Sequence, residues 1–510
     1  MDTRNIPVSF KLTPEMQSVY DETQKPSGFG QHLFVTGKAG SGKTTFLKYL
    51  LEDLGRTKNV LVTAPTGVAA INAGGQTLHS TFMLPFSPIR PGSDSLSYLT
   101  KTKREILKKT EVLVIDEISM VRPDWIDAID ERLRMAKGRH LLPFGGVQVV
   151  MFGDPFQLPP VIKPEDWKYL SLDYEGPFFF NAKVWEKTSF RAIEFTKVFR
   201  QANQEFVDLL NRVRRYTMSK EDMDTLAKVS VTGSATPKKV TKEYTETCVS
   251  LCTHRGVAQA INQSRMGTEG LETFKARVSG KFPESGHPCP AELTLRVGAR
   301  VMSLVNNFPE GYYNGSLGSV TEIDLPGKRV KVALDSGTET WFYEHTWDNN
   351  EYEIDGRTIR TRTVGQFTQI PLSPAWAITI HKSQGLTFDK VFLYIDNVFS
   401  PGQLYVALSR CRTLDGLATN IPVTEKMVIP ESGLLWFEER LEDSGGIFFN
   451  GSGRNEDPVS ALVDLGCPEW LGLGAPITHS GGAPKKKAWQ MKKAKEKKMD
   501  PGVLKALGLD

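Results

Sequence analysis

The sequence has no long hydrophobic run. Apolar stretches such as residues 147–152 (VQVVMF) are far shorter than the ~20 residues that a membrane-spanning helix needs. The first 30 residues contain no basic segment followed by an apolar one, so no secretion signal is predicted and we expect an intracellular protein with no membrane partner. The five cysteines form no CxxC pair, which argues against both a disulfide framework and a zinc ribbon.

The chain also has no net positive charge outside one segment. The chain has 63 Lys and Arg against 59 Asp and Glu, a net charge of +4, but residues 481–510 contain nine Lys and only three acidic residues. That segment carries +6, so the other 480 residues sum to −2, and any role in nucleic-acid binding must rest on motifs there. For the lysine-rich tail at 485–510 we expect an accessory arm that binds nucleic acid or a protein; a nuclear-import signal and a merely solvated run are the alternatives.

With 40% hydrophobic and 24% charged residues, the chain has the composition of a globular protein, and its length suggests several domains. Short apolar runs alternate with helix-compatible segments in two sets, which predicts two α/β domains, each with a parallel sheet covered by helices on both faces. The strand-like runs of the first set are 32–37, 59–64, 111–116 and 147–154, and those of the second are 191–196, 247–252, 375–380 and 390–396.

Residues 306–365 have a different pattern, in which turn signals such as NGSLG at 314–318 separate short alternating runs, as in antiparallel hairpins. We expect a small β-barrel here, inserted in the second α/β domain. The Pro/Ser-rich stretch 83–95 predicts an exposed excursion from the first domain. The predicted boundaries are 1–190 for the first α/β domain, 191–305 and 366–430 for the second, 306–365 for the barrel, 431–484 for a linker and a small element, and 485–510 for the tail.

The strongest local motif is GKAGSGKT at 37–44, directly after a predicted strand and before a predicted helix. Glycines there let backbone N–H groups surround a phosphate, and the helix N-terminus adds its positive end. We expect Lys43 to reach the β- and γ-phosphates and Thr44 to offer its hydroxyl to Mg²⁺, so ATP and Mg²⁺ are the predicted cofactors. The predicted cofactor-binding residues of this loop are Gly37, Ala39, Gly40, Ser41, Gly42, Lys43, Thr44 and Thr45.

A phosphate-binding loop needs an acidic partner on a neighbouring strand, and VLVIDE at 112–117 supplies it. We expect Asp116 to hold Mg²⁺ through water, and Glu117 to orient and deprotonate the attacking water. Gln157 follows another apolar strand, in GDPFQLPPV at 153–161, and we expect it to sense the γ-phosphate because its amide both donates and accepts hydrogen bonds. Lys43, Glu117 and Gln157 are therefore predicted catalytic residues.

Further strings follow in order along residues 10–425. They are APTGVAAINAGGQTLHSTF at 64–82, FGGVQVVMFGDPFQLPPV at 144–161, VFRQ at 198–201, TIHKSQG at 379–385 and YVALSR at 405–410. With the two motifs above, this set resembles the 5′-to-3′ class of superfamily 1 helicases, which is related to RecD, and within it most resembles the Pif (petite integration frequency) family. The resemblance implies two tandem RecA-like parallel-sheet domains with a small β-barrel inserted in the second.

The resemblance also implies roles for single residues. Gln17 resembles the glutamine that recognises adenine upstream of the phosphate-binding loop. Arg200 and Arg410 resemble arginine fingers that the second domain delivers to the transferred phosphoryl group, and Gln384 and Gly385 belong to a motif that the resemblance places at the nucleotide. The residues that resemble single-strand contacts are Pro65, Thr66, Gly67, His79 and Phe82 in the first domain and Thr379, His381 and Lys382 in the second.

The implied function is an ATP-dependent DNA helicase that moves 5′ to 3′ on single-stranded DNA. It would unwind a duplex with a 5′ single-stranded tail, or structured DNA, in replication, repair, recombination or telomere maintenance. The alternative is a DNA-stimulated ATPase that remodels protein–DNA complexes without separating strands. A RecD-like subunit of a nuclease complex has less support, because the chain has no acidic nuclease constellation of its own.

Two smaller features carry hypotheses. Pro85, Phe86 and Ile89, in the excursion at 83–95, are candidates for a wedge that parts the duplex. Cys248 and Cys252, with a nearby His254, have a spacing that suggests a metal, but a fourth ligand is missing from the surrounding sequence, so we expect a structural role within a strand.

Overall fold

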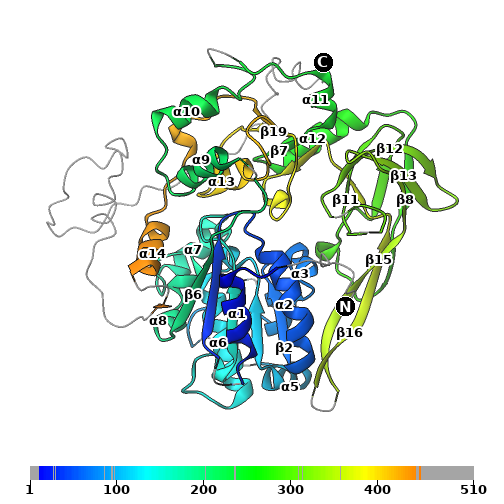
Figure 1. Cartoon of the computed structure of the whole chain (residues 1–510). Helices are drawn as coiled ribbons and strands as arrows, with labels where there is room; N and C mark the ends of the chain where they lie inside the picture. Colours follow the sequence, from blue (N-terminus) through cyan, green and yellow to red (C-terminus); the bar gives the residue numbers. More distant parts are fainter. Residues whose placement is uncertain are drawn as a thin grey trace.

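The computed structural model describes residues 11–448 except 27, 29, 86, 93–95, 97, 202, 235–236, 308, 313, 356–357 and 444–446. Two α/β units lie one above the other, and a β-rich module lies beside both of them (Figure 1). The small element expected between 459 and 474 and the lysine-rich tail lie outside the described residues. No helix among the described residues is long and apolar enough to cross a membrane.

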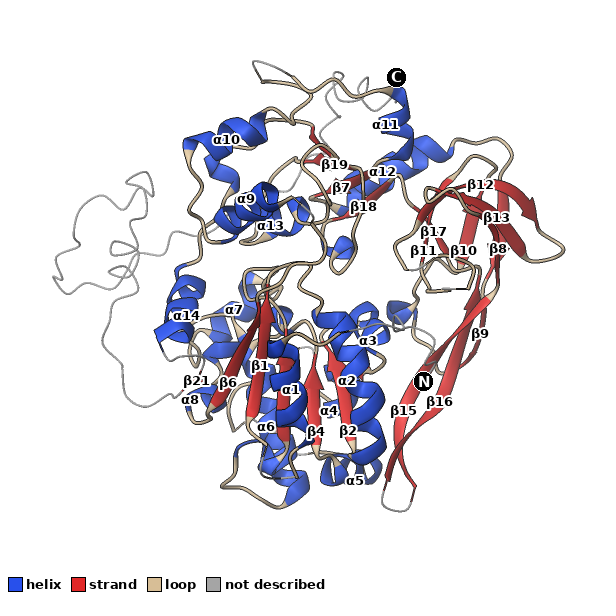
Figure 2. Ribbon diagram, viewed as in Figure 1, coloured by secondary structure: helices blue, strands red, loops and turns tan. Residues whose placement is uncertain are grey.

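The first unit is built on a seven-stranded sheet of order β21-β6-β1-β5-β4-β2-β3, parallel except for β21. Helices α1 and α2 pack on one face of the sheet and α4, α5 and α6 on the other (Figure 2). The strands are β1 (His32–Gly37), β2 (Val60–Ala64), β3 (Gln76–Thr77), β4 (Val112–Ile115), β5 (Gln148–Phe152), β6 (Phe190–Phe195) and β21 (Ile447–Phe448). The helices are α1 (Pro14–Gln24), α2 (Lys43–Thr57), α3 (Gly67–Ala73), α4 (Leu78–Phe82), α5 (Lys101–Lys109), α6 (Pro123–Lys137), α7 (Pro164–Leu170) and α8 (Lys183–Glu186).

Local sequence signals explain where the first unit's helices begin and end. Helix α6 begins with Pro123, whose fixed φ suits a first helical position, and Asp124 in its first turn complements the helix dipole. It ends at Gly138, which has a left-handed φ of 65° that glycine adopts without strain. Pro123 and Gly138 therefore account for where this helix begins and ends.

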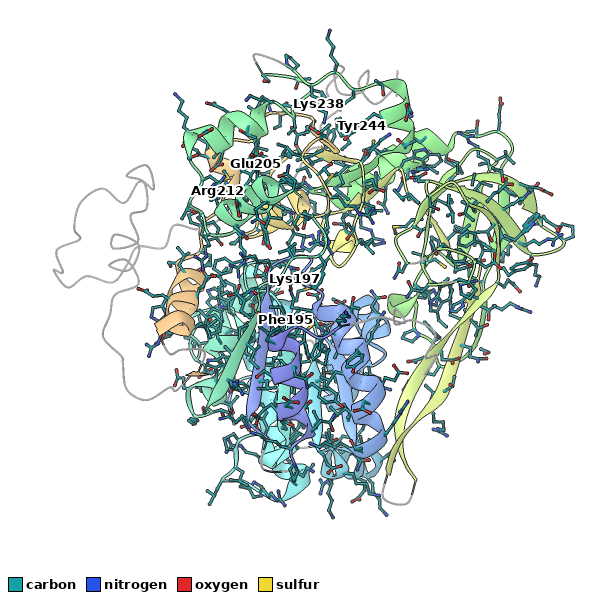
Figure 3. All side chains as sticks on the ribbon, in the orientation of Figure 1. Phe195, Lys197, Glu205, Arg212, Lys238 and Tyr244 are labelled. Carbon is teal, nitrogen blue, oxygen red and sulfur yellow. The ribbon has the colours of Figure 1, made fainter. Side chains whose placement is uncertain are left out.

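Strand β6 corrects the predicted position of residues 191–196. These residues were expected to begin the second domain, but β6 pairs in parallel with β1, from His32 opposite Phe190 to Gly37 opposite Phe195. Figure 3 shows Phe195 at the end of this sheet and Lys197 between the two units, where the chain crosses from one to the other. An apolar run is compatible with a strand in either sheet, because periodicity shows that a strand is buried but not which neighbour it pairs with.

The second unit has a parallel sheet of order β18-β7-β19-β20. Its strands are β7 (Val249–Cys252), β18 (Ala377–Thr379), β19 (Val391–Tyr394) and β20 (Leu417–Thr419), and its helices are α9 (Gln204–Arg214), α10 (Lys220–Ala227), α11 (Lys242–Thr247), α12 (Arg255–Met266) and α13 (Gln403–Leu408). Cys248 and Cys252 are buried at the two ends of β7, and burial raises the pKa of each thiol to about 12.

The β-rich module is larger than the segment 306–365 in which it was expected. A five-stranded antiparallel sheet has the linear order β14-β13-β12-β11-β17, and β9 joins a long hairpin of β15 and β16 that lies against α5 of the first unit. The exposed strands β8 and β9 carry few apolar side chains, so the sequence pattern did not reveal them. The strands are β8 (Glu272–Lys275), β9 (Arg277–Gly280), β10 (Glu292–Leu295), β11 (Arg300–Ser303), β12 (Leu317–Asp324), β13 (Arg329–Leu334), β14 (Glu339–Tyr343), β15 (His345–Asp355), β16 (Thr358–Gln369) and β17 (Leu372–Pro374).

The chain returns to the first unit at its end, where a linker was predicted from 431. Helix α14 (Ser432–Asp443) packs on the first unit (orange in Figure 1), and β21 adds an antiparallel strand to β6. Phe437 is fully buried, and its ring stacks on that of Phe180 with 4.1 Å between the ring centroids. The apolar residues of α14 therefore complete the core of the first unit, a contact that the Gly/Ser-rich composition of the following segment obscured.

The excursion at 83–95 is also less exposed than predicted. Ile89 is 2% exposed, and its backbone N–H donates to Asp124 at the start of α6 (3.0 Å). Pro85 is half-buried, and Phe86 lies outside the described residues. Ile89 is therefore a core residue and does not fit the role of a duplex-parting wedge.

Candidate nucleotide and nucleic-acid sites

The predicted phosphate-binding loop lies at the carboxyl end of β1 and leads into α2. Gly40 and Gly42 have φ angles of 84° and 83°, which glycine adopts without strain. A side chain at Gly40 would also collide with Arg200, because an ideal Cβ there lies 2.4 Å from the Arg200 Cβ. Thr44 and Thr45 are exposed in the first turn of α2, so the helix N-terminus is open for a phosphate.

Lys43 folds back over its own loop. Its Nζ donates to the backbone carbonyls of Gly37 (2.5 Å) and Lys38 (3.2 Å) and to Ser41 Oγ (3.4 Å). Burial lowers the pKa of Lys43, while the carboxylate of Asp154 favours its charged form. A poorly solvated ammonium held only by neutral oxygens is an arrangement that an anion would stabilise.

Asp116 and Glu117 follow β4 at the same edge of the sheet. Burial, and then the neighbouring Glu117, raise the pKa of Asp116, and burial raises the pKa of Glu117. Two buried carboxyl groups that resist ionisation form a set of oxygen ligands that suits a divalent cation. Glu117 also has a φ of 52°, a left-handed value that costs energy in a non-glycine residue and is often found at functional sites.

Gln384 connects the two units at this point. It follows β18 in the second unit, and its Nε2 donates to Glu117 Oε2 (2.9 Å) and to Gln157 Oε1 (3.2 Å) of the first. Its own Oε1 is buried and has no hydrogen-bond partner among the described residues. The structure thus brings together the predicted base, the predicted γ-phosphate sensor and a residue of the TIHKSQG motif, and it leaves one acceptor open.

The two arginines are arranged differently from the prediction. Arg200 lies in the segment that connects β6 of the first unit to α9 of the second, and its guanidinium donates to the carbonyls of Ser409 (3.3 Å) and Gly385 (3.4 Å) in the second unit. Arg410 does come from the second unit, but it is 1% exposed and donates to carbonyls of that unit, including Val406 (2.9 Å). Burial lowers the pKa of Arg410 to about 10, and burial and the nearby Arg410 lower that of Arg200.

Gln17 lies exposed on α1, where its Nε2 donates to Asp21 (2.8 Å). An aromatic side chain that the sequence analysis did not single out lies close by: Phe199 is 53% exposed, and its ring is 3.5 Å from the ideal Cβ position of Gly42. Met16 on α1 approaches the same glycine at 3.5 Å. An exposed ring between α1 and the phosphate-binding loop is a surface on which a planar base could stack.

Of the residues predicted to bind nucleic acid in the first unit, four are partly exposed and one is buried. Pro65, Thr66 and Gly67 are partly exposed at the carboxyl end of β2, where Thr66 Oγ1 accepts from the backbone of Ala69 (3.2 Å). Phe82 is fully buried in the main core, so it offers no surface for a base, and that prediction is wrong. His79, on the same short helix α4, packs edge-on against Trp125 with 4.4 Å between ring centroids.

In the second unit, Thr379 is the last residue of β18, His381 and Lys382 follow the strand, and Lys382 is exposed. The ring of His381 lies nearly parallel to that of Phe399, at 6.3 Å and 13°, and His254 lies 5.3 Å from Phe399 on another side. Phe399 is 43% exposed. The sequence analysis missed this residue because it stands just before the YVALSR motif, in a loop without a regular pattern.

The chain matches known proteins over most of its described length. Residues 11–224 match the model of the PIF1-like helicase family, and residues 374–414 match that of the UvrD-like helicase C-terminal domain. The chain is 33% identical over 469 residues to the ATP-dependent DNA helicase PIF1 of Rattus norvegicus, which covers 89% of this chain and 67% of that protein. The chain belongs to the PIF1-like helicase family. It spans 58–67% of the length of the rat, human and mouse proteins.

Solved structures of a bacterial family member agree in fold. Pif1 from Bacteroides sp in complex with ADP-AlF4 is 47% identical, covers 86% of this chain and 99% of its own, and has a TM-score of 0.80. Bacteroides Pif1 bound to ssDNA has the same identity and a TM-score of 0.63. Over the whole chain, this structure therefore overlaps better with the ADP-AlF4 complex than with the ssDNA complex.

Proposed function

We propose that this protein is an ATP-dependent DNA helicase that moves 5′ to 3′ on single-stranded DNA. The observation that supports the proposal is the contact of Gln384 with Glu117 and Gln157, because it joins the second unit to two residues of the first that we propose to act in hydrolysis. When ATP binds or is hydrolysed, the contact between the two units changes. Because a DNA strand is bound to both units, this change moves the strand. ADP-AlF4 binding and ssDNA binding by Bacteroides Pif1 support the same assignment.

Each group at the nucleotide has a distinct task in this proposal. Lys43 and the open N-terminus of α2 bind phosphate oxygens, and Glu117 orients the attacking water and takes its proton. Gln157 and Gln384 contact the γ-phosphate and the water through amide groups that both donate and accept. Arg200, which lies beside the loop at Gly40, would neutralise charge on the transferred phosphoryl group.

The residues also fit Mg²⁺. Asp116, through water, and the exposed hydroxyl of Thr44 would hold the ion, and the raised pKa of Asp116 reflects the burial of its carboxyl group beside that of Glu117. When bound, Mg²⁺ supplies neutralisation of the phosphate charge that develops during transfer.

The nucleic-acid face is formed by loops after parallel strands in both units. Pro65, Thr66 and Gly67 follow β2, and Thr379, His381 and Lys382 lie at the end of β18 and just after it. Hydroxyl, amide and ammonium groups of this kind bind phosphates and confer no sequence preference, which suits a motor that must move along any strand. A duplex with a 5′ single-stranded tail is the expected substrate, and a solved structure 46% identical to this chain concerns DNA unwinding at forked dsDNA by two coordinating Pif1 helicases.

The test is unwinding of matched duplexes with a 5′ or a 3′ single-stranded tail by the wild type and by Lys43→Ala. We expect unwinding of the 5′-tailed duplex only, and its loss in the variant with ssDNA binding retained. Equal unwinding of the 3′-tailed duplex would overturn the polarity, and activity in the variant would overturn the mechanism. ATP hydrolysis without unwinding of either duplex would favour the remodelling ATPase.

A further inference from the structure

Helix α13 is seated directly on the nucleotide site of the first unit. Gly402, just before it, has a φ of 70°, and an ideal Cβ there would lie 2.4 Å from the carbonyl oxygen of Phe156 and 2.5 Å from that of Gln157. Only glycine fits this approach. The end of the same segment carries Ser409, whose carbonyl accepts from Arg200. One short helix therefore contacts the sensor loop at its start and the Arg200 side chain at its end.

Tyr405 lies in the middle of α13, and its hydroxyl joins two parts of the first unit. It accepts a hydrogen bond from the backbone N–H of Ala39 in the phosphate-binding loop (2.9 Å) and donates one to Asp154 Oδ2 (3.2 Å). Burial and the nearby Asp154 raise the pKa of Tyr405, which keeps the hydroxyl protonated as this pair of bonds requires. Ala39 was predicted to bind the cofactor, but its N–H is already used by Tyr405.

Asp154 is in turn fixed from the opposite side. Its Oδ1 accepts from Arg214 Nε (3.2 Å) and Nη2 (3.1 Å), and Arg214 Nη1 donates to Glu438 on α14 (2.7 Å). Asp154 is 0% exposed and Arg214 is 4% exposed, so these bonds lie in a medium where a misplaced charge is costly. These four side chains, of which Glu438 is partly exposed, form a continuous path from the phosphate-binding loop to α14.

From this geometry we propose that Tyr405 is a positioning residue for ATP hydrolysis, which holds the phosphate-binding loop and the segment carrying Arg410 at a fixed separation through Ala39 and Asp154. Arg214 and Glu438 keep the Asp154 carboxylate in place. The proposal rests on the proposed function, because it assigns a role within the same ATPase site. A phenylalanine ring would still fill the space that Tyr405 occupies. Without the hydroxyl, however, Gln384 and Arg200 would no longer be held at a fixed position relative to the phosphate-binding loop.

The experiment compares Tyr405→Phe with Tyr216→Phe in the full chain. Tyr216 is a matched control because it is buried 6.1 Å from Phe156, ring to ring, and its hydroxyl has no hydrogen-bond partner among the described residues. For Tyr405→Phe we expect kcat for ssDNA-stimulated ATP hydrolysis to fall about tenfold with KM for ATP within about twofold, as for loss of alignment in the reacting complex. Tyr216→Phe is expected to keep both constants within about twofold.

Three results would overturn the proposal: wild-type kcat in Tyr405→Phe, equal losses in both variants, or a rise in KM with a lower melting temperature that explains the loss. Glu438→Gln supplies a second measurement, because residues of one network give non-additive effects on kcat when combined with Tyr405→Phe. Strictly additive effects on kcat would show that Glu438 on α14 is not coupled to Tyr405. If the wild type hydrolyses ATP but unwinds no duplex, the helicase assignment fails while the ATPase comparison still tests Tyr405.

Discussion

The nucleotide side and the nucleic-acid side of this molecule are constructed differently. At the nucleotide side, buried groups of both units are joined to each other, as in the bonds of Gln384 to Glu117 and of Tyr405 to Asp154. At the nucleic-acid side, the predicted contacts are partly exposed, and those with hydrogen bonds, such as Thr66 and Thr379, make them within their own loops. Chemistry requires fixed geometry, whereas a strand that must be bound and released requires groups that remain free to exchange partners.

The largest expected effect comes from a variant that removes ATP hydrolysis and leaves ssDNA binding intact, which tests whether the two sides are separable. Glu117→Gln keeps the shape and the hydrogen-bonding partner of Gln384 but removes the base, so we expect kcat for ATP hydrolysis to fall about 10²- to 10⁴-fold. Binding of ssDNA should stay near the wild-type value. The measurement is steady-state hydrolysis alongside ssDNA binding, with Glu165→Gln on the exposed start of α7 as the control.

The pH dependence of hydrolysis adds a second readout for Glu117. Burial raises the pKa of this carboxyl group above its ordinary value, and a general base works only when deprotonated. Hydrolysis is therefore present above the raised pKa and lost as pH falls through it. An acidic limb at the ordinary glutamate value, or one that persists unchanged in Glu117→Gln, would contradict the assignment.

The next prediction tests whether the nucleic-acid side contains an aromatic ring on which a base can stack. Phe399 is exposed between His381 and His254, and an aromatic ring that stacks on a base contributes about 1–3 kcal/mol to binding. Phe399→Leu should therefore weaken ssDNA affinity by roughly five- to a hundredfold, whereas Phe399→Trp should retain it. Titration of a fluorescent oligonucleotide measures both variants.

Phe82 is the counterpart that separates stacking from packing. Because its ring is fully buried, Phe82→Ala should cost about 3–5 kcal/mol of unfolding free energy and leave the ssDNA affinity of the folded protein unchanged. Weaker ssDNA binding by Phe82→Ala at constant stability would contradict the assignment of Phe82 to the core. Unchanged ssDNA binding by Phe399→Leu would contradict the assignment of Phe399 as a stacking surface.

The residues that sequence predicted well are those whose spacing alone defines a local structure. The loop at 37–44 needs glycines at set positions and a following helix, and Asp116 and Glu117 need only the end of a buried strand, so both could be located without tertiary information. Phe82 was placed wrongly because a motif gives residue types in order, whereas burial depends on which side of α4 faces the core.

What the sequence could not provide are contacts between segments far apart in the chain. Tyr405 and Ala39 are 366 residues apart, and nothing in either segment specifies that a hydroxyl will meet that particular N–H. The same limit explains β6, whose apolar run suits either sheet, and α14, whose buried Phe437 finds its partners in a unit that the chain left more than two hundred residues earlier. Of these three contacts, the bond between Tyr405 and Ala39 is the one that joins the two units.

The smallest expected effect concerns the lysine-rich tail, where a third kind of contact with DNA is predicted. Its nine lysines would act through counterion release, without fixed geometry, so deletion of 481–510 should weaken ssDNA binding a few-fold at low salt and reduce the salt dependence of the affinity. The kcat for ATP hydrolysis at saturating ssDNA should not change, because the nucleotide side is held by contacts inside residues 11–448. Truncation after residue 500 is the matched control, since it removes only one of the nine lysines. If both truncated proteins bind ssDNA alike at every salt concentration, the tail does not contribute to ssDNA binding. It is then a solvated run or binds another partner, and ssDNA is bound by the two units alone.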